Sequence, residues 1–522
     1  MCRLYDKMIT GRNAVSGNIF KEVCSMKKSV SYILTGLLLV SLLQACGEES
    51  NVSSGGPADS GDEVIDTLAA GDPGSEAEII SDDLPSDLDF GGEEFAILTR
   101  EASYIHAKVD VEEITGDVFN DALYNCNRNV ENRLNIVLKD CPAEGFGDQN
   151  SMGKRAVMSG DSTYDLFYLE DYPTLSLALD GYMMDFDSIP YIDLTKPYWS
   201  QSINPSLTIH NKRFFAYSDS NLTPTDYTHV LVFNKNMAEK YNLPNIYEMV
   251  TSGEWTIDSY GKAASDVTAD VDGNSVMDEN DRYGFLSQPK HVLPSFWVAS
   301  EAQCIKKDGN DMPVFNIVSD QKFISVYDRI FAVTRDNKSW FENKMGSNSD
   351  LTLNNMFVND QALFFDNTMY YIAILRGMEH DFGILPYPKW DEAQVQYHAR
   401  VEGGCVPGVP VTSAGEANMI GAVLEAWASE ASKLVIPAYF EISLKGKSAR
   451  DEDSEAMLDL IYDCRTYDLG DTYWCELLRD GIFEGLFIKD NRDMVSEFTK
   501  KDEKIQKNIQ KIIDAFDALE NG

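Results

Sequence analysis

The chain has 522 residues, more than one ordinary domain contains. Of its side chains, 43% are hydrophobic and 11% are aromatic, which is enough to bury a large core. The formal net charge is −41, and no cluster of Lys and Arg interrupts the acidic sequence. Such a chain repels the phosphate backbone of nucleic acids. Composition therefore excludes a nucleic-acid-binding protein and favours two or more folded lobes.

The segment from Met26 to Cys46 has the order of a cleaved export signal. Two lysines follow Met26, an apolar stretch covers residues 32–43, and Ala45 precedes Cys46. The apolar stretch is too short for a comfortable bilayer span. The order resembles the bacterial lipobox, which implies a signal peptide in residues 26–45, a lipid on Cys46 and an extracytoplasmic location on the outer face of the cell membrane. A buried helix with an incidental cysteine is the alternative.

Two segments beside this signal lack the apolar periodicity of a folded element. Residues 1–25 are interpreted as an upstream extension of the start site. Residues 46–90 are rich in Gly, Ser, Asp and Glu, and include Ser53-Ser54-Gly55-Gly56. Such a sequence buries too little apolar surface to offset chain entropy, which predicts a lipid anchor followed by a disordered acidic linker.

Six cysteines follow Cys46, with wide spacings and no CxxC pair: Cys126, Cys141, Cys304, Cys405, Cys464 and Cys475. A body of this size does not need covalent cross-links, so free and mostly buried thiols are favoured. Their even number leaves one or more disulfides open.

The folded part opens with alternating strands and helices. The predicted strands cover residues 95–98, 136–138 and 164–169, and the predicted helices cover residues 117–134 and about 151–158. This β-α-β-α-β order indicates an α/β protein with a parallel sheet covered by helices. Ligands of such sheets bind beyond the carboxyl ends of the strands, which directs attention to residues 99–101 and 170–172.

A second β/α region follows in the chain. Its predicted strands cover residues 229–233, 361–365 and 382–385, with helices starting near Met237 and Ile257 and another between the last two strands. Apolar residues repeat at helical spacing from Phe498 to Leu519, which predicts an amphipathic helix packed on the body.

Several short motifs occur in this second region, namely Leu231-Val232-Phe233-Asn234-Lys235, Gly253-Glu254-Trp255-Thr256 and Phe382-Gly383-Ile384-Leu385-Pro386-Tyr387-Pro388-Lys389. With the lipobox and the β/α opening, they make residues 92–520 resemble bacterial extracellular solute-binding proteins of family 1, the maltose-binding-like group of carbohydrate ABC importers. The resemblance implies a two-lobe, type II periplasmic-binding-protein-like fold, with a multi-crossing hinge and a ligand cleft. It also implies a monomer that binds a carbohydrate or other small solute and docks on the permease subunits.

Carried onto this sequence, the resemblance also places the lobe boundaries. Lobe 1 comprises residues 91–220 plus 366–411, and lobe 2 comprises residues 221–365 plus 412–522. The hinge crossings then fall near Asp219-Ser220, near Asp366-Asn367 and near residues 410–413. Hinge closure around the solute is the expected motion.

A sugar site needs aromatic faces for the ring, and carboxylate, amide or arginine groups for the hydroxyls. The candidate ligand-binding residues at strand ends, loops and hinge crossings are Arg100, Glu101, Glu170, Asp171, Tyr172, Trp199, Asp219, Trp255, Trp297, Asp366 and Tyr370. Tyr172, Trp297 and Tyr370 rank first because the resemblance places them beside the cleft. Core packing is the alternative for each aromatic residue.

The acidic stretch from Asp270 to Asp281 has the ligand spacing of a twelve-residue calcium loop. The expected ligands are Asp270, Asp272, Asn274, the carbonyl of Val276, Asp278 and Asp281. Ser275 stands where a Gly usually makes the sharp turn, and Asp281 replaces a longer Glu. A structural Ca²⁺ site is expected, an acidic solvated turn is the alternative, and no catalytic cofactor is expected.

The sequence carries none of the common catalytic signatures. GxSxG, HExxH and GxxxxGK[ST] are absent, and the chain has only six His. Glu170 and Asp171 are neighbours that point apart on an extended chain, whereas glycoside hydrolysis needs two facing carboxyl groups. The main expectation is a non-enzymatic receptor. A sensor-input protein of the same fold, a cell-surface glycoside hydrolase and a structural adhesin are the alternatives.

The lipobox interpretation predicts the effect of Cys46→Ser. Only a thiol at this position accepts the lipid, so the variant should lose metabolic labelling with a fatty acid and should leave the membrane fraction. Cys141→Ser, in the predicted folded part of the chain, is the matched control and should keep the label. Unchanged labelling of Cys46→Ser contradicts the assignment.

Overall fold

The computed structural model describes residues 81–520 apart from 103, 104, 107, 343–348, 373, 374, 376, 377 and 441–451. The predicted signal peptide, Cys46 and residues 47–80 of the predicted linker lie outside the described residues. Within the described part of the chain, no helix is both long enough and apolar enough to cross a membrane.

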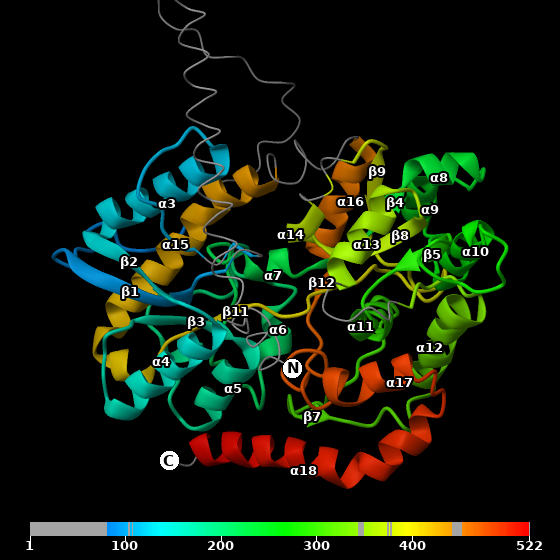
Figure 1. The fold of residues 1–522 in the computed structure, drawn as a ribbon. Helices are drawn as coiled ribbons and strands as arrows, with labels where there is room; N and C mark the ends of the chain where they lie inside the picture. The colour runs from blue at the N-terminus through cyan, green and yellow to red at the C-terminus, as the bar shows by residue number, and fades with distance from the viewer. Residues whose placement is uncertain are drawn as a thin grey trace, which may run out of the picture. The chain divides into compact units, whose positions relative to one another are not determined.

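The first sheet has the strand order β11-β3-β1-β2 (Figure 1). β1 (Glu93–Arg100) pairs in parallel with β2 (Ile136–Ala143) and with β3 (Leu166–Glu170), and β11 (Cys405–Gly408) pairs antiparallel with β3. The connecting helices are α3 (Val118–Leu134) and α4 (Phe146–Ser159). The predicted β-α-β-α-β order and the parallel pairing are both confirmed.

Local chemistry sets the limits of α3. The side chain of Asp117 accepts a hydrogen bond from the backbone N–H of Asn120, which satisfies one of the donors left free at a helix start. The helix ends at Asn135, which takes a left-handed conformation with φ of 51°. Asn tolerates this conformation better than most residues, so the chain turns directly into β2.

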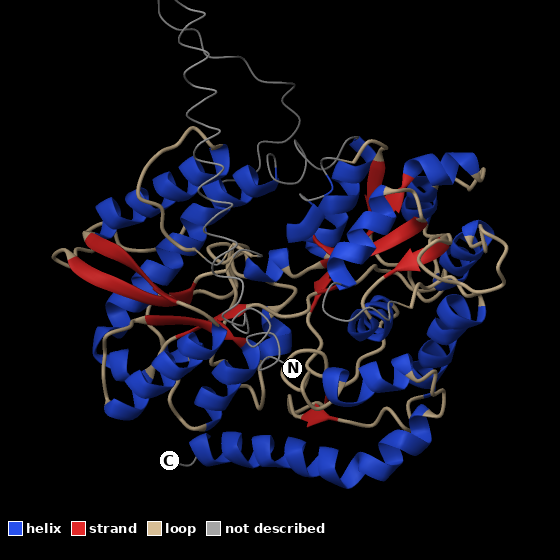
Figure 2. Cartoon of the chain, in the orientation of Figure 1, coloured by secondary structure: helices blue, strands red, loops and turns tan. Residues whose placement is uncertain are grey.

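Alternate side chains of β1 enter two different apolar clusters. Phe95 and Ile97 pack with the buried side of α3, whereas Leu98 packs with Ala156 of α4. This alternation follows from the two-residue period of a strand and gives the sheet a helical layer on each face. Figure 2 shows these helices flanking the sheet.

The second sheet has the strand order β5-β8-β4-β9. β4 (His229–Asn234) is buried along its whole length and pairs antiparallel with β8 (Ala362–Thr368) and β9 (Phe382–Leu385). β5 (Tyr283–Leu286) adds a parallel edge to β8. The three strands predicted in this region are confirmed within a few residues of the expected limits.

The remaining elements cover the sheets and connect them. After the first sheet come α5 (Asp171–Leu179), η1 (Phe186–Ser188), α6 (Asn204–Leu207) and α7 (Thr223–Asp226). Around the second sheet lie α8 (Lys235–Lys240), α9 (Ile246–Ser252), α10 (Ile257–Val267), α11 (Pro289–Ala299), β6 (Lys306–Lys307), β7 (Pro313–Val314), α12 (Gln321–Phe331), η2 (Ala332–Asp336), α13 (Ser349–Val358) and α14 (Met369–Ile372). The last part contains β10 (Ala399–Arg400), η5 (Val411–Glu416), α15 (Ala417–Ala438), α16 (Glu452–Asp463), β12 (Arg465–Thr466), η7 (Arg479–Phe483), α17 (Glu484–Ile488) and α18 (Met494–Glu520).

The predicted lobe boundaries are wrong in two places. β8 and β9 pair with β4, so residues 366–385 belong to the second sheet and not to lobe 1. α15 packs along α3, so it belongs with the first sheet and not with lobe 2 (Figure 1). The chain therefore returns to the first sheet between β9 and β11, and the expected crossing at Asp366-Asn367 lies inside a strand.

The expected linker also ends too late. Asp82 is buried, and its two carboxylate oxygens each accept a hydrogen bond from Arg133 at 2.6 Å. The N–H of Phe90 donates to the carbonyl of Leu134 at 2.9 Å. Residues 81–90 thus pack on α3, because a bidentate ion pair with the buried Asp82 carboxylate fixes this segment to the body.

The six cysteines after Cys46 are free thiols, as favoured by their spacing. The amphipathic C-terminal helix is also confirmed as α18. Phe498 in its first half lies 4.7 Å, ring to ring, from Phe483 of η7, whereas Phe516 near its end lies 5.5 Å from Phe214. One helix thus contacts elements that cover both sheets.

The packing of α15 on the first half of the chain predicts the effect of Gly421→Ala. A Cβ at Gly421 would stand 1.8 Å from the carbonyl oxygen of Pro190, so the two segments must separate. Overpacking of this kind lowers the free energy of unfolding by about 1–3 kcal/mol. Gly485→Ala in α17 is the matched control, because its Cβ would meet nothing within 4 Å. Urea unfolding of both variants makes the comparison, and equal stability of the two contradicts the packing.

Candidate functional site

The candidate ligand-binding ends of the two sheets are defined by strand direction. β1 ends at Arg100 and β3 ends at Glu170, and Cys405 at the start of β11 pairs with Glu170. In the second sheet, His229 at the start of β4 pairs with Thr368 at the end of β8. Polar side chains at these edges are the first place to seek a ligand site.

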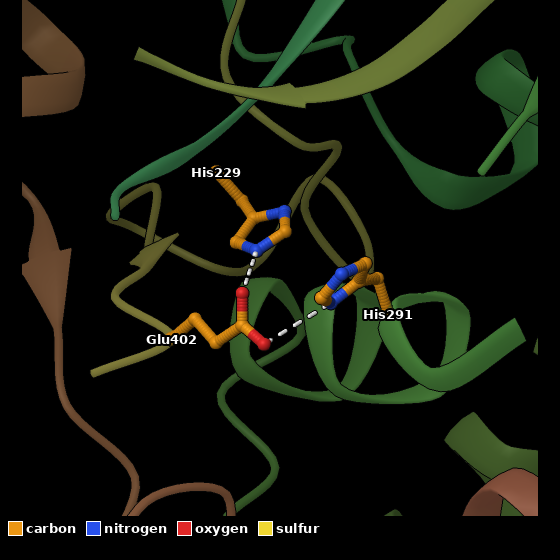
Figure 3. A group of neighbouring side chains, drawn as sticks. All are labelled: His229, His291 and Glu402. Atoms are coloured by element: carbon orange, nitrogen blue, oxygen red, sulfur yellow. Dashed lines mark hydrogen bonds and ion pairs between the residues drawn. The ribbon is translucent and has the colours of Figure 1, made fainter. Parts of the chain in front are cut away.

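Glu402 lies on the segment that joins the second sheet to the first. Its backbone N–H donates to the carbonyl of Tyr227 at 3.1 Å, which fixes the segment beside the start of β4. Its carboxylate lies 3.5 Å from Nε2 of His229 and 3.7 Å from Nδ1 of His291 in α11 (Figure 3). Lys290 at 3.4 Å and Arg479 at 3.5 Å complete its surroundings.

Arg400, two residues earlier, is buried at the centre of this group. Its Nε and Nη2 donate to the two carboxylate oxygens of Asp471 at 2.5 and 3.0 Å, a side-on ion pair in which both side chains are fully buried. Its Nη1 lies 2.9 Å from Nε2 of His229 and 3.1 Å from Nδ1 of His291. A guanidinium can only donate, so both imidazole nitrogens accept and both rings are neutral.

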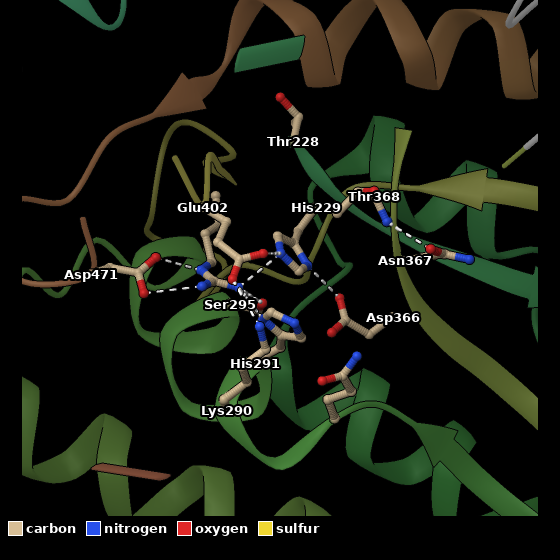
Figure 4. Close-up of polar contacts among 12 residues, drawn as sticks. Thr228, His229, Lys290, His291, Ser295, Asp366, Asn367, Thr368, Glu402 and Asp471 are labelled. Carbon is tan, nitrogen blue, oxygen red and sulfur yellow. Dashed lines mark hydrogen bonds and ion pairs between the residues drawn. The ribbon is translucent and has the colours of Figure 1, made fainter. Parts of the chain in front are cut away.

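A second carboxylate fixes the orientation of the His229 ring. Nδ1 of His229 donates to Asp366 at 2.9 Å (Figure 4). The hydroxyl of Ser287 donates to the other oxygen of Asp366 at 2.7 Å. This arrangement leaves the lone pair of Nε2 free for Arg400. The ring is therefore held by Asp366 on Nδ1 and by Arg400 on Nε2.

The electrostatics of the group follow from burial and charge. Burial alone would raise the pKa of Glu402, whereas the charges of Lys290 and Arg479 beside it lower that pKa. Burial lowers the pKa of His291 far below its ordinary value. Burial also lowers the pKa of His229, but the Asp366 carboxylate outweighs it and the net pKa is raised. His229 is thus the first of the two rings to gain a proton on acidification.

His229, His291 and Glu402 offer the donor set of a metal site, since their ligand atoms lie within 4.8 Å of one another. A Zn²⁺ ion would need nitrogens at about 2.0–2.1 Å. Nη1 of Arg400 already lies between the two imidazole nitrogens, and its side-on pairing with Asp471 keeps it there. The arrangement therefore fits a guanidinium N–H and does not fit a metal ion.

Four of the predicted ligand residues cluster at the sheet edges. Arg100 forms an ion pair with Glu170, and burial raises the pKa of Glu170 despite this partner. Asp171 begins α5 and does not lie in a loop; burial and the Glu170 charge raise its pKa well above the ordinary value. Asp366 holds His229, as described above. A ligand-binding role for these four residues stays a prediction.

The other polar candidates lie in different surroundings. Glu101 is exposed, and its backbone N–H donates to the carbonyl of Ala143. Asp219 accepts a hydrogen bond from the hydroxyl of Tyr462 at 3.2 Å, and burial raises its pKa to about 6. Tyr370 packs edge-on against His106 at 5.3 Å. The side chain of Tyr172 lies outside the described part of the chain.

The expectation that Trp199, Trp255 and Trp297 contact the ligand is wrong. Each is at most 1% exposed. The indole N–H of Trp199 donates to Glu425, and that of Trp255 donates to the carbonyl of Pro386. Trp297 packs against Phe483 with ring centres 4.8 Å apart. Apolar burial of a large ring outweighs its proximity to a strand end, so these side chains are part of the core.

Sequence reasoning missed the central residues of the site: His229, His291, Arg400, Glu402 and Asp471. They are far apart in the chain, and pairings such as that of Arg400 with Asp471 arise only from the fold. One signal was available, because His229 and His291 are two of only six histidines and His229 opens a predicted buried strand. A polar residue in such a position is rarely incidental.

The predicted calcium loop gathers only part of its expected ligand set. Carboxylate oxygens of Asp270, Asp272 and Asp281 lie within 4.8 Å of one another. Asp278 is not in this group, and Asn274 and Asp278 accept hydrogen bonds from the backbone N–H groups of Val276 and Asn280. Ser275 takes the positive φ, 66°, that a Gly would adopt in such a loop. Calcium binding stays a prediction.

Solved structures show the same fold at low sequence identity. A cyclo/maltodextrin-binding protein complexed with maltotetraose is 12% identical, covers 82% of this chain and 97% of its own, and has a TM-score of 0.52. A sugar transporter protein from Rhizobium etli in an open conformation is 12% identical, with coverage of 82% and 99% and a TM-score of 0.51. RafE from Streptococcus pneumoniae, in its apo form, is 12% identical, with coverage of 82% and 98% and a TM-score of 0.50.

No protein-family model matches the sequence, and no curated protein matches it. The solved structures show that the chain has the α/β fold of type II periplasmic binding proteins. The predicted fold class is therefore confirmed.

The calcium prediction is tested by thermal melting. If Ca²⁺ binds the Asp270 loop, a ligand concentration of 100 times Kd adds about 2.7 kcal/mol to stability, so a chelator should lower the Tm and Ca²⁺ should restore it. Asp272→Ala should remove this dependence. Asp308→Ala, in another exposed acidic turn, is the control and should keep it. A chelator-insensitive Tm of the parent leaves only a solvated turn.

Proposed function

We propose that the protein is an extracytoplasmic solute-binding lipoprotein that captures a sugar and delivers it to the permease of an ABC importer. The observation that carries the proposal is the fold shared with sugar-binding proteins over 82% of the chain. Their names state binding and transport of sugars, and none of the three names an enzyme. The role proposed is accordingly capture without chemical conversion.

The geometry at the sheet edges supports a binding role. Glu170 and Arg100 come from the first sheet, His229 and Asp366 come from the second, and Glu402 lies on the segment that joins them. A solute held between such groups gains contacts from both sheets only when they approach each other. Binding energy then favours a closed state that a permease can distinguish from the empty one.

The anchor and the transporter partner belong to the same proposal. A lipid on Cys46 keeps the receptor at the membrane, and the acidic linker lets it reach the permease. The protein acts as a monomer in this scheme, because one chain carries both sheets and the residues between them. Loss of the gene should then abolish uptake of the solute without affecting its hydrolysis.

Glu170→Gln tests the site within this proposal. Hydrogen bonds to a charged group contribute about 1.5–3 kcal/mol, and 1.4 kcal/mol is tenfold in affinity, so the variant should bind its sugar about 10-fold to 100-fold more weakly. Glu94→Gln is the matched control, since Glu94 pairs with Lys139 on the exposed surface. Calorimetry of the full-length protein against mono-, di- and oligosaccharides gives the affinities, and chromatography of the mixture detects products. Released products, or no binding to any sugar, refute the proposal.

A further inference from the structure

The tryptophans offer no open face for a sugar ring. All seven fall among the described residues, and six are at most 5% exposed: Trp199, Trp255, Trp297, Trp340, Trp427 and Trp474. Apart from Trp297, each of the six donates its indole N–H to an acceptor inside the protein. Trp390 is half-buried and packs against the core.

The Glu402 carboxylate, in contrast, is only loosely paired. Its contacts with His229, His291, Lys290 and Arg479 measure 3.4–3.7 Å, longer than the roughly 2.7–2.9 Å of a well-formed charge-assisted hydrogen bond. Its side chain is 16% exposed. The acceptor capacity of this carboxylate is therefore not used up by its neighbours.

Lys290 is the complementary donor. Its side chain is 33% exposed, and within the described part of the chain its ammonium has no hydrogen-bond or ion-pair partner besides Glu402. Figure 4 shows the two side chains in the same group as His291. An ammonium carries three donors and no acceptor, and a carboxylate carries acceptors alone. The couple thus presents a loosely paired acceptor beside a donor group with hydrogens to spare.

Such a couple matches two adjacent hydroxyls of one sugar ring. Each hydroxyl can donate and accept, so one donates to Glu402 while its neighbour accepts from Lys290. This contact engages the edge of the ring and needs no aromatic face. A longer glucan, in contrast, gains most of its affinity by burying ring faces on aromatic side chains.

We propose that the solute is a mono- or disaccharide, held by adjacent hydroxyls between Glu402 and Lys290, and that the site is not built for a longer glucan stacked on tryptophan. The inference rests on the proposed function, because it assigns the class of sugar to the same site.

Calorimetry on the full-length protein tests the inference with glucose, galactose, maltose and maltotetraose as probes. A mono- or disaccharide should bind at least tenfold more tightly than maltotetraose. Lys290→Met and Glu402→Gln should each weaken that binding tenfold or more. Trp390→Ala, which removes the one partly exposed indole, should leave it unchanged.

The outcomes separate the inference from the proposed function. If maltotetraose binds most tightly and Trp390→Ala weakens it, a sugar receptor remains but edge-on recognition is wrong. Unchanged sugar binding in Lys290→Met also shows that edge-on recognition is wrong. Because the Lys290 side chain is partly exposed, this variant tests the Glu402–Lys290 couple even where Glu402→Gln fails to fold. If none of the four sugars binds, the inference fails as well, and the wider sugar panel then decides the proposed function.

Discussion

The buried ion pair between Arg400 and Asp471 is the interaction on which the rest of the candidate site depends. Both side chains are fully buried, so the free energy of removing two charges from water has to be offset by their mutual attraction and hydrogen bonds. All three guanidinium nitrogens contribute to this attraction. Nε and Nη2 donate to Asp471, and Nη1 lies between His229 and His291. The position of Arg400 then fixes that of Glu402, two residues along the same crossing segment. A metal-like donor set is consequently organised around an arginine.

Local patterns in the sequence predicted the elements well. The apolar run 382–385 matches β9, and the α3 range needed only the recognition of Asp117 as its cap. Periodicity and capping act over a few residues, so they are readable from one sequence. The parallel order of the first sheet followed from the alternation of strands and helices.

Long-range pairing was not readable in the same way. β8 lies more than 120 residues after β4, and no local signal states that the two strands share a sheet. The same limit applies to the site, since the partner of Arg400 is 71 residues away. The tryptophans were misplaced for a related reason, because whether a large ring is a core residue or a ligand contact is decided by what packs against it. Strand ends, in contrast, can be predicted locally, and Arg100 and Glu170 do lie at the ends of β1 and β3.

The long helix α18 has a consequence for motion that the sheets alone do not suggest. It lies against Phe483 near its start and against Phe214 near its end, so it connects the coverings of the two sheets. Any rotation of one sheet relative to the other has to bend α18 or change its packing at one of these two contacts. In the proposed receptor, closure would therefore have to change aromatic contacts that are remote from Glu402. Substitutions on a surface that never touches the solute can shift its affinity by changing how easily the protein closes.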